Sequence, residues 1–76
     1  MSIYDEIKQE RRNQNIKWGE QNHYPTYWMV ILMEEVGEAA QCLCGKSINY
    51  KNYRKEMIQV AAVAIAALEC FDKNDI

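Results

Sequence analysis

The pattern of apolar and polar positions predicts three helices joined by two connections. In the first segment, Ile3 and Ile7 form a narrow apolar stripe. Ser2 and Asp5 are spaced as in a capping box, in which each side chain binds the other residue's backbone N–H. These features predict a first helix over about residues 2–14.

A polar segment, residues 13–25, follows and ends at the only proline of the chain. Such a length without clear periodicity predicts a loop or a broken helix, and long loops in small domains tend to be functional or disordered. Thr26 is the expected N-cap of a second helix that reaches about residue 44, with Gly45 just beyond its end. One side of this helix is broadly apolar: Met29, Leu32, Met33, Val36, Ala39, Ala40 and Leu43.

A third helix is expected over about residues 52–71. Between Met57 and Leu68 it is apolar nearly all round, apart from Gln59, and it is rich in alanine. A helix that is apolar on every side is normally buried on every side. Three helices cannot bury it alone, so the sequence predicts a homo-oligomer, and it does not distinguish a dimer from a tetramer.

The chain has 76 residues, which predicts one all-α domain over residues 1–76. A domain of this size buries only about 60% of its unfolded surface. Because 49% of the residues are hydrophobic, part of the apolar surface is expected to close against another copy.

Three carboxylates are the strongest chemical signal: Glu34, Glu35 and Glu38. On a helix they share an arc of roughly 100°, at spacings where like charges repel. The segment Tyr27 to Gly45 contains no lysine or arginine that would relieve this repulsion. A hard divalent cation is therefore the expected partner, because Mg²⁺ and similar ions prefer carboxylate oxygens.

A fourth carboxylate, Glu56, enters the apolar third helix, and Gln59 follows one turn later. A charge in a packed interior is costly unless it is paired or bound to metal. The 17 residues between Glu38 and Glu56 suit a helical hairpin that returns to the same level. We therefore expect Glu56 to face the arc of three glutamates across an antiparallel helix pair.

Overall charge and cysteine usage limit the possible partners. A net charge of −2 argues against nucleic acid as an electrostatically bound partner. The three cysteines lack a disulfide or zinc spacing, which favours free thiols in a reducing cytoplasm. Residues 1–14 are too polar for a signal peptide, and the longest apolar run, residues 60–68, is about half of what a bilayer needs.

At this point the chain resembles a known family. Glu34-Glu35-Val36-Gly37-Glu38 followed by Glu56-Met57-Ile58-Gln59 is similar to the EExxE…ExxD signature of the MazG-like all-α nucleoside triphosphate pyrophosphohydrolases. The segments at residues 17–21 and 59–62 also resemble MazG-like proteins, and the resemblance covers about residues 11–71. It implies an oligomeric bundle of the MazG-like type. Gln59 departs from the family's acidic residue and removes one anion from the site.

The resemblance also implies a reaction. A Mg²⁺-dependent enzyme, with Mn²⁺ as a possible substitute, would convert a nucleoside triphosphate and water into the monophosphate and pyrophosphate, as a house-cleaning activity. Glu35, Glu38 and Glu56 match the metal ligands, with Gln59 at the fourth position. Glu34 is either a ligand or the group that orients the attacking water.

Candidate substrate contacts follow from charge and aromaticity. Lys17, Arg54 and Lys55 are candidate phosphate contacts, although solvated helix faces are the commoner role for such residues. Trp18 is the better candidate to stack on a base, whereas Trp28 is expected in the core. Polar loop residues are candidates to read the edge of the base, although a loop role without chemistry is the commoner one for the histidine: Gln21, Asn22 and His23.

Three other functions fit parts of the pattern. A non-catalytic oligomer of the same fold, binding nucleotide or metal as a regulator, is compatible with Gln59. A carboxylate-bridged di-iron bundle normally uses Glu-x-x-His motifs, and no glutamate here has a histidine three residues later. A structural oligomer with solvated glutamates would show no effect of Mg²⁺ on its melting temperature.

Overall fold

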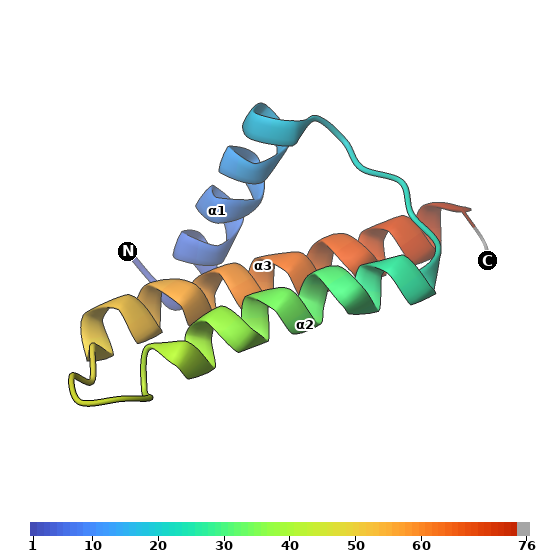
Figure 1. The fold of residues 1–76 in the computed structure, drawn as a ribbon. Helices are drawn as coiled ribbons and strands as arrows, with labels where there is room; N and C mark the ends of the chain where they lie inside the picture. The colour runs from blue at the N-terminus through green and yellow to red at the C-terminus, as the bar shows by residue number, and fades with distance from the viewer. Residues whose placement is uncertain (75–76) are drawn as a thin grey trace.

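A computed structural model describes residues 1–74 of the chain. Three helices make up the fold: α1 (Ile3–Trp18), α2 (Pro25–Gln41) and α3 (Tyr50–Asn74). Helices α2 and α3 run antiparallel side by side, and α1 crosses α3 obliquely (Figure 1). The described residues contain no strand, so the all-α prediction is confirmed.

Helix α1 begins as the sequence predicts and ends later. Ser2 Oγ accepts from the Asp5 N–H at 3.1 Å, and the Asp5 carboxylate accepts from the Ser2 N–H at 3.1 Å. The helix continues to Trp18 because the polar residues after position 14 contain no helix breaker. Gly19, with φ at 74°, stops it. Of the two alternatives predicted for residues 13–25, a loop or a broken helix, the loop is wrong up to residue 18: the helix breaks at Gly19, and residues 19–24 form the connection.

Helix α2 begins two residues earlier than expected. Tyr24 is the N-cap and Pro25 occupies the first helical position, so the prediction of Thr26 as N-cap is wrong. Proline suits that position because its missing N–H would lack an intrahelical partner anyway. The helix ends at Gln41, before the turn in which Gly45 adopts φ of 84°. Helix α3 extends the predicted residues 52–71 at both ends.

The core lies between α2 and α3. Trp28 is buried, as predicted, against Val63, Ala66 and Cys70. Ala62 has no exposed surface, and alanines here let the helices approach closely. The predicted apolar side of α2 is divided: Leu32 and Ala39 face the core, whereas the rest of that side is exposed.

Apolar positions on α2 and α3, most of them exposed, form two stripes, here called the outer face: Met29, Met33, Val36, Ala40 and Leu43 on α2, and Met57, Ala61, Ala64, Leu68 and Phe71 on α3. Both stripes repeat with alternating steps of four and three residues, and the two alanines at positions 61 and 64 are half-buried. At about 100° per residue, both stripes lie on the side of the antiparallel pair opposite to α1. Within residues 1–74, no helix is long and apolar enough to cross a membrane.

Candidate metal centre

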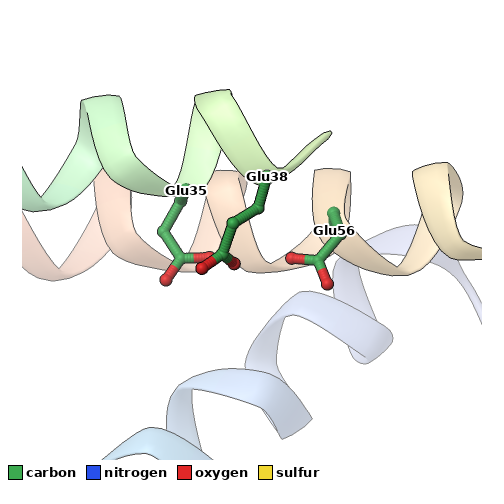
Figure 2. A group of neighbouring side chains, drawn as sticks. All are labelled: Glu35, Glu38 and Glu56. Atoms are coloured by element: carbon green, nitrogen blue, oxygen red, sulfur yellow. The ribbon is translucent and has the colours of Figure 1, made fainter. Parts of the chain in front are cut away.

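Three glutamates meet where α2 and α3 lie side by side. Glu35 and Glu38 on α2 and Glu56 on α3 each offer a carboxylate oxygen, and these three atoms all lie within 4.8 Å of one another. Figure 2 shows the side chains directed toward one another, on the side of the hairpin where α1 passes. The expectation that Glu56 faces the glutamates of the second helix is confirmed for Glu35 and Glu38.

The turn between the helices sets this register. The Asn49 N–H donates to the Cys42 carbonyl at 2.9 Å, which closes the connection. The Asn49 side chain then accepts from the Asn52 N–H at 3.0 Å, at the beginning of α3. A side-chain oxygen in this role satisfies an N–H group that the first turn leaves unpaired. Helix α3 therefore returns along α2 with Glu56 at the level of Glu38.

Two oxygens of the cluster are buried without a hydrogen-bond partner. These are Oε2 of Glu35 and Oε2 of Glu56, and both residues are half-buried. Burial raises the pKa of Glu35, and the charges of Glu38 and Glu56 raise it further. Burial likewise raises the pKa of Glu56, followed by the charge of Glu38. Both shifts have the causes expected where anions gather in a poorly solvated place.

Three other glutamates have cationic partners: Glu6, Glu20 and Glu69. Glu6 accepts from both terminal nitrogens of Arg54, at 2.8 and 2.7 Å, and Glu20 is paired with Lys73. These contacts lower the pKa of Glu6 and of Glu20. Among residues 1–74, by contrast, neither lysine nor arginine forms an ion pair with the three clustered glutamates. The cluster therefore differs from an ordinary charged surface.

The other predicted members of the site lie close by in the sequence. Glu34 is exposed and lines a cavity beside Glu35, but it does not belong to the group of three. Gln59 is half-buried on α3, three residues after Glu56. The predicted set of four carboxylates is therefore reduced to three that converge.

Helix α1 adds a carboxylate that the sequence reading missed. The charge of Glu10 contributes to the raised pKa of Glu56, so the two side chains lie near one another. Glu10 is half-buried, and Gln14, one turn later, is the buried polar residue of α1. The sequence offered one signal for this placement: Glu10 and Gln14 continue the stripe of α1 that contains Ile7.

A cavity of about 700 Å³ opens beside the cluster, between α1, the 19–24 connection and the α2–α3 pair. Glu34 and Glu35 line it, together with the predicted substrate contacts Trp18 and Gln21. The cavity's cationic side chains are Arg11 and Lys73. Arg11 donates to Glu69 at 3.1 Å and Lys73 pairs with Glu20.

The predicted phosphate contacts Lys17, Arg54 and Lys55 do not line this cavity. Lys17 lies over the Trp18 ring, with its Nζ 4.6 Å from the ring centroid. Arg54 is held by Glu6. Lys55 is exposed, and its charge partly offsets the raised pKa of Glu56. The structure therefore brings together three of the four predicted metal ligands, Glu35, Glu38 and Glu56, but not the predicted phosphate contacts.

This arrangement has the chemistry of a site for a hard cation. Carboxylate oxygens from two helices converge, and two of these carboxylates have a buried oxygen without a hydrogen-bond donor. Within residues 1–74, no lysine or arginine forms an ion pair with the three glutamates. Mg²⁺ and Mn²⁺ favour such oxygen ligands. Comparison with protein-family models, with curated proteins and with solved structures found no match for this chain.

Proposed function

We propose that the chain is a divalent-metal-dependent nucleoside triphosphate pyrophosphohydrolase of the MazG-like type. The observation that carries the proposal is the convergence of Glu35, Glu38 and Glu56 within 4.8 Å, with buried oxygens that lack donors. The resemblance of the two glutamate motifs to that family supplies the reaction. Three carboxylates alone would repel a triphosphate, so the proposed activity requires metal.

In this proposal Glu35, Glu38 and Glu56 bind Mg²⁺, or Mn²⁺ in its place. The bound ion supplies neutralisation of phosphate charge and an acidified water. Glu34, exposed at the cavity wall beside Glu35, accepts a proton from the attacking water and orients it. The cavity then holds the rest of the nucleotide, where Arg11 and Lys73 offer positive charge that the carboxylates lack.

The proposal includes a homo-oligomer. Met29, Met33, Leu68 and Phe71 of the outer face are each about half exposed, at 54, 57, 64 and 45%. Two apolar stripes with steps of four and three residues suit packing against a second hairpin, because facing helices then interlock side chains. Since the carboxylates lie on the opposite side, the oligomer would leave the cavity open. The three free thiols suit a reducing cytoplasm.

A second candidate is a non-catalytic regulator that binds nucleotide or metal in the same cavity. Gln59 favours it, because an amide in place of a carboxylate leaves the site with less negative charge to hold an ion. The two candidates differ in turnover, which only the enzyme proposal predicts.

Product analysis distinguishes them. Purified protein is incubated with the common NTPs and dNTPs, with and without Mg²⁺, and monophosphate is resolved from diphosphate. Monophosphate together with pyrophosphate, formed only with metal, is the expected result. A folded protein that binds nucleotide without any turnover would contradict the enzyme proposal and favour the regulator.

A further inference from the structure

Helix α1 carries a polar stripe toward the α2–α3 hairpin. Glu6, Glu10 and Gln14 follow one another at steps of four residues, so they lie on one side of the helix. Glu6 and Glu10 are half-buried, and Gln14 is only 8% exposed. Contact with the hairpin therefore includes two carboxylates and an amide, whereas a helix that only packs normally presents apolar residues.

The two ends of this stripe have defined neighbours. Glu6 accepts from both terminal nitrogens of Arg54, which precedes the cluster residue of α3 by two positions. Gln14 lines the cavity of about 700 Å³ together with Glu35. Glu10 lies between these two positions, about one helical turn from each. Its place on α1 is therefore beside the three glutamates, which point to the side of the hairpin where α1 passes (Figure 2).

The Glu10 carboxylate is held there without a cation. Within residues 1–74, no lysine or arginine forms an ion pair with it. The Asn13 amide donates to it at 3.5 Å, which is longer than an ordinary hydrogen bond. The charge of Glu10 also contributes to the raised pKa of Glu56. A further anion thus approaches a group of anions, and this repulsion is relieved when a positive charge joins them.

Position 59 lacks the charge that would otherwise lie on this side of the cluster. Gln59 is half-buried on α3, about one turn after Glu56. Its side-chain oxygen can bind a hard cation, but an amide carries no negative charge. Glu10 approaches Glu56 from α1 and brings one negative charge back to the same part of the site.

The distance of Glu10 from the cluster limits its role. Its oxygens do not belong to the group that lies within 4.8 Å of one another. Mg²⁺ usually keeps several of its waters, and a carboxylate outside the direct ligands can accept hydrogen bonds from them. Such outer partners change metal affinity by about 10–100-fold. A carboxylate at this position can therefore matter to the ion without touching it.

We propose that Glu10 is the fourth carboxylate of the metal centre, where it accepts hydrogen bonds from water on the ion and replaces the acid that position 59 lacks. The inference rests on the proposed function and adds a residue from outside the two glutamate motifs. Within the described residues, α1 packs against α3 and not against α2. An ion held by glutamates of α2 and α3 and by Glu10 should therefore fasten α1 to the hairpin.

Titration calorimetry of the full chain with Mn²⁺ compares two variants of α1. Glu10→Gln removes the proposed carboxylate. Glu6→Gln makes the same change in net charge one turn earlier, where the carboxylate is paired with Arg54. We expect Glu10→Gln to weaken Mn²⁺ binding about tenfold and Glu6→Gln to leave it unchanged.

Position 59 tests whether Glu10 replaces the missing acid. Gln59→Glu is introduced into the wild type and into Glu10→Gln. The new carboxylate should strengthen Mn²⁺ binding about tenfold in Glu10→Gln and much less in the wild type, because two residues that share one role are not additive. An equal gain in the two backgrounds would overturn the replacement.

Hydrogen exchange gives a readout that a distant background charge would not change. Saturating Mg²⁺ should slow the exchange of the α1 amides in the wild type and in Glu6→Gln, because the ion fastens this helix. It should not slow them in Glu10→Gln. Equal slowing in Glu10→Gln would overturn the link between α1 and the ion.

The remaining outcomes separate the two proposals. If Glu56→Gln loses Mn²⁺ binding while Glu10→Gln binds as tightly as Glu6→Gln, the metal centre stands and only the present inference fails. If the wild type does not bind Mn²⁺, both this inference and the proposed function are overturned.

Discussion

The two faces of the α2–α3 hairpin are incomplete in different ways. On the side of α1, Glu35, Glu38 and Glu56 gather without cations. On the outer face, Met33 and Leu68 belong to apolar stripes that no part of the described chain covers. The first deficiency calls for positive charge and the second for apolar area. In our proposal, one hairpin therefore serves two partners, an ion on one face and a second copy on the other.

Removing a cluster carboxylate should have the largest effect. Glu38→Gln or Glu56→Gln should lower Mg²⁺-dependent triphosphate hydrolysis by at least about 100-fold, because each removes a proposed metal ligand, and even outer partners of ligands cost 10–100-fold. Steady-state pyrophosphate release measures this. Glu6→Gln, which breaks the contact with Arg54 instead, is the control and should keep its activity. Full activity in both cluster variants would refute the site.

Introducing a charge on the outer face should test the role of that face separately from the role of the glutamate cluster. Leu68→Lys places a cation in an apolar stripe on α3, where the residue is 64% exposed in the single chain. Burying an unpaired charge between copies is costly, so the oligomer should dissociate at micromolar concentration. Light scattering coupled to gel filtration measures the mass. A wild-type monomer, or an unchanged oligomer in the variant, would refute the role of this face.

Metal should stabilise the native protein through the cluster. At 100 times its dissociation constant, an ion that binds only the folded state stabilises it by about 2.7 kcal/mol. Calorimetry should therefore show Tm rising with Mg²⁺ concentration in the wild type. The double variant Glu38→Gln/Glu56→Gln should show no rise. A Tm that is insensitive to Mg²⁺ in the wild type would instead favour solvated glutamates.

The stability of the metal-free protein should depend on pH, and this effect should be smaller and have a defined sign. Because the folded-state pKa values of Glu35 and Glu56 are raised above the usual 4.5, the native state holds protons more tightly than the unfolded state. The resulting stability is present below about 4.5 and is lost as the pH rises through the raised values. In EDTA, the wild-type Tm should therefore fall over this range relative to that of Glu35→Gln. Parallel Tm profiles would contradict the raised pKa values.

The helices and the approach of the glutamates could be predicted from the sequence because both depend on the spacing of residues that are near one another in the chain. The apolar periodicity predicts three helices, and the spacing of Glu38 and Glu56 predicts their approach. The end of α1 was missed because polar residues without a breaker are compatible with either helix or loop. The roles of Glu10 and Arg11 depend on how α1 crosses α3, which no local pattern determines. The partner of Arg54 was missed for the same reason, since Glu6 is 48 residues away.

Metal binding at the glutamate cluster is the central claim, and titration with Mn²⁺ followed by electron paramagnetic resonance tests it most directly. The free-ion signal should decrease as wild-type protein is added and recover when Mg²⁺ competes. With Glu56→Gln in place of wild type, it should decrease much less. Equal loss of signal with both proteins, or none with wild type, would contradict the assignment of Glu35, Glu38 and Glu56 as a metal centre.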